Sequence, residues 1–259
     1  MRLTRILDIR YELRDHVAWV TMSRPDVLNA LSKGMFEGLK SGLEKATSDG
    51  QVWFVAITGE GSAFSAGLDI KEVGGFGSRG EARRFVYELV KPFWTALFQC
   101  DKPVISVVNG PAYGAGAEIP LASDIVVASD TSRFAFSGGR VGALCCISGA
   151  IGPLVVHGRS IVELNLTGRS VSAKAAEKMG LVNYTVPKSK LVQTTQGILE
   201  DMLRVSPVSN ASFKRIRRET IPRKGLQKAY RELLNTITSP DFRKGSTAFA
   251  RKEMPTYYT

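Results

Sequence analysis

Two turns rich in glycine and alanine are the segments of this sequence best suited to chemistry. The first lies in GSAFSAGLDI, Gly61–Ile70, which contains one ionisable residue, and the second is AYGAGAE, Ala112–Glu118. Glycine and alanine allow sharp turns and let a ligand approach the backbone N–H groups closely. Two such N–H groups directed at one point form an oxyanion hole. The predicted chemistry is therefore stabilisation of charge that develops on a substrate oxygen, without a protein nucleophile.

Each of these turns follows a segment that reads as a buried strand. The near-continuous apolar runs QVWFVAITGE and KPVISVVNG, residues 51–60 and 102–110, are typical of strands covered on both faces. The second turn opens a helix, whose first N–H groups have no intrahelical acceptor and lie at the positive end of the helix dipole. Strand, turn and helix follow one another at least twice, which predicts an α/β fold.

The remaining segments fit the same alternation. Residues 6–24 predict two strands joined by a charged turn, and apolar residues from Leu28 to Leu43 recur at helical spacing. A glycine-rich segment, Gly74–Gly80, predicts a flexible loop before a helix over residues 81–100. IVVASD, residues 125–130, predicts a further strand.

Length and composition indicate a folded, soluble protein. With 259 residues and 44% hydrophobic content, the chain can bury a substantial core as one large domain or a domain with an appendage. No apolar run reaches the ~18 to 20 residues of a membrane helix. The first sixteen residues mix charges where a signal peptide has an apolar stretch. We therefore expect a cytoplasmic protein without a membrane partner.

The formal net charge of +11 is concentrated in two stretches, residues 212–225 and 241–253. Neither stretch interleaves aromatic residues that could stack on bases, so the charge does not favour a nucleic acid partner. We interpret the first stretch as a solvated helix face. By itself, such an excess of positive charge is compatible with a nucleic acid, a membrane surface or an anionic small molecule.

The three cysteines do not predict a metal site. Cys145 and Cys146 are adjacent, and no CxxC or CxxH spacing is present. Reduced, buried thiols are the expected state, and no metal is predicted.

Five ordered blocks give the chain a family resemblance. They are SRPDVLNAL (residues 23–31), GEGSAFSAGLDIKEV (59–73), NGPAYGAGAEIPLASDIVVAS (109–129), LTGRSVSAKAAEKMGLVNYTVP (166–187) and FARKEMP (249–255). In this order they resemble the motifs of the crotonase family, the enoyl-CoA hydratase/isomerase superfamily. The resemblance covers almost the whole chain.

The resemblance implies a fold and an assembly. It implies an α/β, crotonase-like spiral of ββα repeats over residues 1–195, which carries the CoA site and the oxyanion hole. A C-terminal helical trimerisation region, residues 196–259, is expected to serve oligomerisation and to cap CoA. The implied assembly is a homotrimer or a hexamer made of two trimers.

The resemblance also implies an acyl-CoA substrate and the groups that bind it. The backbone N–H groups of Leu68 and Ala115 would hold the thioester oxygen as it becomes an enolate, each donor contributing ~3 kcal/mol in the transition state. No cofactor is implied beyond coenzyme A as part of the substrate.

Contacts to coenzyme A follow by position in the same motifs. Val27 and Ala66 would offer backbone groups around adenine and pantetheine, and Lys71 a charge near the nucleotide. Phe249 and Lys252 would form a C-terminal wall, from this subunit or from a neighbouring one.

Two positions concern proton transfer. Glu118 matches the first of two glutamates that hydratases of the family use, whereas the second position is occupied by Gly138. Loss of a positioned acid or base costs ~10² to 10⁴ in rate. The sequence therefore favours double-bond isomerisation, or another proton transfer with one carboxyl group, over fast hydration.

Other reactions on the same scaffold stay open. Arg140 could attract a substrate carboxylate, as in a decarboxylase, or could be solvated; thioester hydrolysis is a further alternative. Ser137 and Gly138 also match the naphthoyl-CoA synthase branch, but Ala143 and Cys145 depart from it.

An RNA-binding branch is the weakest alternative. It uses a lysine-rich helix, and the corresponding helix here has only Lys33, Lys40 and Lys45.

Asp69 and Asp124 belong to family motifs, and we expect them to brace turns.

Overall fold

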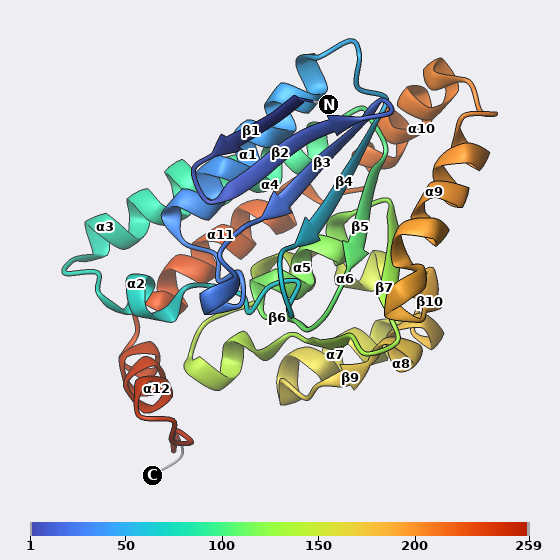
Figure 1. Cartoon of the computed structure of the whole chain (residues 1–259). Helices are drawn as coiled ribbons and strands as arrows, with labels where there is room; N and C mark the ends of the chain where they lie inside the picture. Colours follow the sequence, from blue (N-terminus) through green and yellow to red (C-terminus); the bar gives the residue numbers. More distant parts are fainter. Residues whose placement is uncertain (1, 258–259) are drawn as a thin grey trace.

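A seven-stranded sheet runs through the middle of the molecule, with helices on both sides (Figure 1). The computed structural model describes residues 2–257; residues 1, 258 and 259, which belong to the expected N- and C-terminal regions, lie outside it. The strands, in spatial order, are β1 (Arg2–Ile6), β2 (Ile9–Arg14), β3 (Val17–Met22), β4 (Phe54–Gly59), β5 (Val104–Val108), β7 (Ile125–Ser129) and β10 (Tyr184–Val186). The first two pairings are antiparallel, and all pairings from β3 onward are parallel.

A second, small sheet forms where the long strands end. It consists of β6 (Ala112–Tyr113), β8 (Arg133–Ala135) and β9 (Val171–Ser172), and the isolated bridges Leu31–Leu68 and Ser65–Ala112 extend its pattern. Successive long strands thus lead through a short extended piece into a helix. This arrangement agrees with the expected spiral of ββα repeats.

Helices fill the connections and the C-terminal part of the chain. They are α1 (Lys33–Ser48), α2 (Ile70–Gly74), α3 (Arg79–Arg84), α4 (Lys91–Gln99), α5 (Ala115–Ala122), α6 (Cys146–Val155), α7 (Gly158–Thr167), α8 (Ala173–Lys178), α9 (Leu191–Met202), α10 (Pro207–Glu219), α11 (Arg223–Ile237) and α12 (Pro240–Ala250). A π-helical segment, Phe85–Val90, joins α3 to α4, and short 3-10 segments include Pro25–Val27 and Ser137–Val141.

Helix α1 begins later than its apolar pattern predicts. Ser32 caps it by accepting a hydrogen bond from the Met35 N–H, at 3.0 Å. Leu28 instead adopts a left-handed conformation, with φ of 53°, and Leu31 pairs with Leu68. Met35, Leu39 and Leu43 lie in the buried face of the helix, as the spacing predicts.

The loop expected over Gly74–Gly80 is shorter than the sequence predicts. Gly74 is the last residue of α2, and Arg79 begins α3. Ser78 accepts from the Glu81 N–H, at 3.2 Å, and so fixes the start of α3. The glycine content therefore marks a turn between two short helices.

The expected division after residue 195 falls inside α9 (Leu191–Met202). Leu191 and Leu199 of this helix are buried in an apolar cluster with Val107 and Val127 of the sheet. Helix α9 thus packs on the sheet along its length, and the chain continues through it without a break.

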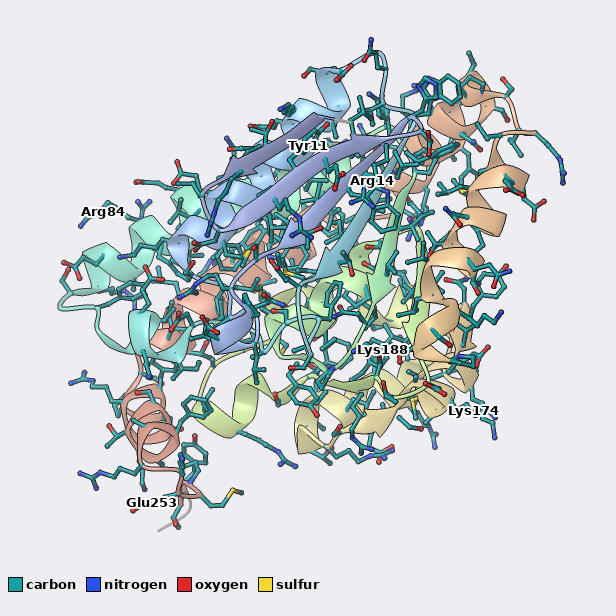
Figure 2. The ribbon with its side chains drawn as sticks, in the orientation of Figure 1. Tyr11, Arg14, Arg84, Lys174, Lys188 and Glu253 are labelled. Carbon is teal, nitrogen blue, oxygen red and sulfur yellow. The ribbon has the colours of Figure 1, made fainter. Side chains whose placement is uncertain are left out.

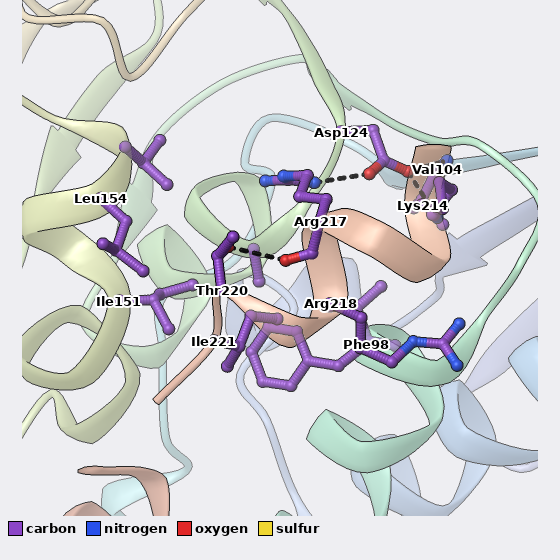
Figure 3. A pocket seen from close by; sticks show the side chains of 13 residues that line it. Phe98, Val104, Asp124, Ile151, Leu154, Lys214, Arg217, Arg218, Thr220 and Ile221 are labelled. Carbon is purple, nitrogen blue, oxygen red and sulfur yellow. Dashed lines mark hydrogen bonds and ion pairs between the residues drawn. The ribbon is translucent and has the colours of Figure 1, made fainter. Parts of the chain in front are cut away.

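The basic stretch over residues 212–225 is only partly a solvated face, and this prediction requires correction. Lys214 and Arg217 of α10 each donate to Asp124, at 2.6 Å, and the Lys214 side chain is only 10% exposed (Figure 3). Asp124 also accepts from the Val104 N–H, at 2.8 Å. The two cations therefore attach α10 to the sheet, and the Lys214–Asp124 pair is largely removed from water.

Charged side chains elsewhere project from the surface. Arg84, Lys174 and Glu253 lie at the periphery of the molecule (Figure 2). Helix α12 leads to the C-terminus at one edge, where it packs against α2 and the 3-10 segment Ser137–Val141 (Figure 1). None of the helices over residues 2–257 is long and apolar enough to cross a membrane.

Candidate functional site

A pocket of about 330 Å³ brings together most of the residues singled out in the sequence. Its walls come from the segment before α1, the turns that precede α2 and α5, the segment from residue 137 to 145, and α12. The predicted site residues that line it are Val27, Ala66, Leu68, Lys71, Ala115, Gly138 and Phe249. Glu118 and Lys252 are the predicted residues that do not line it.

The bridge between Leu31 and Leu68 fixes the direction of one N–H group. Leu31 donates to the Gly67 carbonyl at 2.7 Å and accepts from the Asp69 N–H at 3.1 Å. Because alternate peptide groups of an extended strand point to opposite sides, the Leu68 N–H points away from Leu31. Leu68 itself lines the pocket.

The second N–H belongs to Ala115, the first residue of α5. Gly67 has φ of +92°, and a β-carbon there would lie 2.6 Å from the Tyr113 oxygen and 3.3 Å from the Ala115 nitrogen. Only glycine therefore lets the two turns touch. Over the described residues 2–257, neither the Leu68 nor the Ala115 N–H has a protein acceptor.

Glu118 does not line the pocket and is buried, with 1% of the residue exposed. Its Oε1 accepts from the Ser148 N–H at 2.8 Å, so the carboxyl caps α6. Burial raises the pKa of Glu118 to about 8, although hydrogen bonds from Ser148 and Ile147 act in the opposite direction. At neutral pH this carboxyl is therefore mainly protonated.

Gly138 lies in the pocket wall, where a side chain would meet atoms of Ala143 and Cys145. A β-carbon there would be 3.0 Å from the Ala143 oxygen and 3.0 Å from the Cys145 sulfur. The thiol thus lies where a side chain of residue 138 would begin. The carboxylates among the described residues that line the pocket are Asp26 and Asp69, and Asp69 pairs with Arg24.

Cys145 is a pocket residue that sequence reasoning did not assign to the site. All three cysteines are buried and free, as predicted, but Cys145 also lines the pocket. Burial raises the pKa of its thiol, and the nearby Glu118 carboxyl adds to the shift. Two sequence signals pointed to it: its short distance along the chain from Gly138, and its place at a position that matters in the naphthoyl-CoA synthase branch.

Lys252 and Arg140 lie away from the pocket, whereas Asp69 lines it and also has a structural role. Lys252 is exposed beyond the end of α12, and Arg140 directs its guanidinium to the Thr167 carbonyl, with Nη2 at 3.3 Å. Asp69 caps α2 and pairs with Arg24 at 3.0 Å, so it braces a turn, as expected for both aspartates. Among the residues described, no three His, Cys, Asp or Glu side chains group as a metal site.

Three kinds of comparison relate the chain to known proteins. A family model described as "Enoyl-CoA hydratase/isomerase" matches residues 12–259. A relative from Dictyostelium discoideum, named "Probable enoyl-CoA hydratase, mitochondrial", is 31% identical over 256 residues, covering 95% of this chain and 89% of the relative.

Solved structures of other proteins align with this fold over almost the whole chain. An enoyl-CoA hydratase from Mycobacterium avium subsp. paratuberculosis K-10 aligns with a TM-score of 0.83 at 27% identity, covering 98% of this chain and 100% of that one. A carnitinyl-CoA hydratase from Mycobacterium avium aligns with a TM-score of 0.82 at 29% identity, covering 98% and 99%.

Proposed function

The chain belongs to the enoyl-CoA hydratase/isomerase family, and from this we propose that it binds an acyl-CoA thioester and stabilises the thioester enolate between two backbone N–H groups. The observation that carries the proposal is the contact between the turns at Gly67 and Gly114, which leaves the Leu68 and Ala115 N–H groups without protein acceptors. Preorganised donors of this kind lower the free energy of a developing oxyanion by ~3 kcal/mol each.

Glu118 is proposed to transfer the proton. It lies three residues after Ala115 in α5, so the two residues share a helix face. Gly138 and Cys145 stand in the pocket wall, so the described segment from residue 137 to 145 supplies no carboxyl group that could hold a water molecule beside Glu118. We therefore propose a proton transfer with one carboxyl, such as movement of a double bond, in preference to fast hydration.

The role of a base imposes a pH dependence. Glu118 must be ionised to remove a proton from the carbon next to the thioester, and the pKa of about 8 leaves a minor fraction ionised at pH 7. In a double-bond shift the same carboxyl then returns the proton to a carbon further along the chain. The isomerisation rate is therefore expected to rise with pH up to about 8.

The test uses two substrates that report different reactions. Vinylacetyl-CoA gains conjugated enoyl-thioester absorbance on isomerisation, whereas crotonyl-CoA loses it on hydration. We expect the wild type to convert vinylacetyl-CoA, to hydrate crotonyl-CoA slowly, and to lose ~10² to 10⁴ in isomerisation rate in Glu118→Gln. Cys146→Ala, a buried neighbour outside the pocket, is the control.

Rapid hydration by the wild type, or unchanged isomerisation in Glu118→Gln, would contradict the proposed reaction. Product masses also report the alternatives, because decarboxylation shortens the acyl group and hydrolysis releases free coenzyme A. The structure gives decarboxylation no added support, since Arg140 is turned toward Thr167.

A further inference from the structure

Two groups of segments line the pocket and differ in chemical character. The segment before α1 and the start of α2, which we call the charged end, contribute the side chains of Asp26, Asp69 and Lys71. The segment from residue 137 to 145, which we call the apolar end, contributes no charged group; its lining residues are Ser137, Gly138, Val141, Ala143, Leu144 and Cys145. A ligand with one ionic and one apolar part therefore has a single favourable orientation.

A charged acyl group has no partner at the apolar end. Lys71 is the only basic residue among those described that line the pocket, and it lies at the charged end. Arg140 is close in sequence, but its Nε and Nη2 atoms contact the Thr167 carbonyl at 3.4 and 3.3 Å. A carboxylate buried without a cation or a full set of hydrogen bonds is strongly disfavoured.

Cys145 differs from its buried neighbours in its access to the pocket. It lines the pocket, whereas the buried residues Cys146 and Ile147, which follow it in the sequence, do not. The Cys145 sulfur also fills the space beside Gly138. Because protein interiors are close-packed, an acyl chain that reaches this thiol meets a wall that does not yield at low cost.

We infer that the apolar end selects a short, uncharged acyl chain and that Cys145 is the residue that limits its length. This inference rests on the proposed binding of an acyl-CoA thioester. It assigns Cys145 a role in specificity that is separate from the proton transfer proposed for Glu118.

Equilibrium binding of saturated thioesters tests the inference without turnover. Coenzyme A and its acetyl, butyryl, octanoyl and succinyl thioesters are titrated calorimetrically into the wild type. Each buried methylene should raise affinity about fourfold up to butyryl, and octanoyl-CoA should bind at least tenfold more weakly than butyryl-CoA. Succinyl-CoA should also bind at least tenfold more weakly than butyryl-CoA.

Two alanine variants locate the limit. Cys145→Ala removes the sulfur, so the longest chain tolerated should increase by about one methylene. Cys146→Ala, the adjacent buried thiol outside the pocket, should leave the chain-length profile of the wild type unchanged. Equal affinity for octanoyl, succinyl and butyryl thioesters, or the same shift in both variants, would overturn the inference. Failure of every thioester to bind would instead remove the proposed function.

A second measurement on the wild type does not depend on the folding of a variant. Methyl methanethiosulfonate, a small neutral reagent, modifies thiols, and peptide mass spectrometry identifies the cysteine. Butyryl-CoA should slow modification of Cys145 at least tenfold, and coenzyme A less than twofold. Equal protection by both ligands would place the acyl group away from Cys145.

Discussion

Residue identity and burial act together at Glu118. The same carboxyl would be strongly acidic at an exposed helix start, where the dipole favours its charge. Here the surrounding core raises its pKa to about 8, even though it accepts N–H hydrogen bonds at the start of α6. Folding therefore raises the proton affinity of Glu118, and the stability of the folded protein depends on pH as a result.

The folded protein should become less stable as pH rises from about 5 to 8. Unfolded glutamate releases its proton near the ordinary value of 4.5, whereas folded Glu118 keeps it up to about 8. Between these values the folded state binds more protons, so the unfolding free energy falls by about 1.4 kcal/mol per pH unit from this group. Below the lower value and above the upper one, its contribution stops changing.

Urea unfolding at pH 5.5 and 7.5 measures this slope. Glu118→Gln, which keeps the shape without an ionisable group, should lose the slope. Glu163→Gln is the matched control, because that side chain is 51% exposed and pairs with Arg169 at 2.7 Å. The expectation fails when wild type and Glu118→Gln depend on pH equally.

At the scale of elements, close backbone approach positions the pocket wall. A β-carbon on Gly142, which has φ of +73°, would lie 2.6 Å from the Asp241 carbon and the Phe242 nitrogen. Helix α12, whose Phe249 lines the pocket, therefore rests directly on the segment that carries Gly138. Loss of the contact between Gly142 and α12 should move Phe249 relative to Gly138, and so change the shape of the pocket.

Gly142→Ala should weaken coenzyme A binding at least tenfold and should increase amide hydrogen exchange in α12. The added methyl group clashes with backbone and the positive φ disfavours alanine. Gly149→Ala is the control. A β-carbon at Gly149 would have no atom within 4 Å, so alanine should stabilise α6 by ~0.5 to 1 kcal/mol. If amide hydrogen exchange in α12 were the same in Gly142→Ala as in the wild type, the close contact between Gly142 and α12 would be contradicted.

Helix α10 gives a second prediction at this scale. Asp124→Asn should lower the unfolding free energy by about 2 to 4 kcal/mol, because it leaves the charge of the largely buried Lys214 with the Lys102 carbonyl, at 2.7 Å, in place of a carboxylate. Asp201→Asn breaks a pair with Arg204 that is 77% exposed on both sides, and should cost under ~0.5 kcal/mol. Urea titration compares the two, and similar losses would mean that α10 is not held by Asp124.

At the scale of the whole molecule, the exposed apolar side chains of α10 bear on assembly. Phe213 and Ile216 are 66% and 71% exposed, while Lys214 and Arg217 of the same helix face the core. Large apolar groups of this exposure are typical of surfaces that pair with another chain. They agree with the trimer that the family resemblance implies, which stays a prediction.

We expect light scattering after size exclusion to give the mass of a trimer or of a hexamer for the wild type. Phe213→Asp with Ile216→Asp should lower the mass toward one subunit, because two charges would be buried without partners. Leu7→Asp, at a residue 52% exposed in the turn between β1 and β2, is the control and should keep the wild-type mass. A monomeric wild type would exclude the assembly.

The sequence by itself determined the fold class, the family and the two turns of the candidate site. This was possible because the deciding signals are local: apolar runs predict buried strands, and glycine at Gly67 and Gly114 permits backbone conformations that other residues avoid. Five ordered motifs then identified the superfamily, and the matching family model and solved structures confirmed it.

Only the tertiary structure decided what surrounds the reactive groups. Packing between different segments of the chain sets three features of the molecule. It buries Glu118, it places the Cys145 sulfur beside Gly138, and it pairs Lys214 with Asp124, 90 residues away. No local pattern encodes such contacts, since the same residues read equally well as solvated or buried. Dielectric surroundings and close packing, which set proton affinity and pocket length, exist only once the chain has folded.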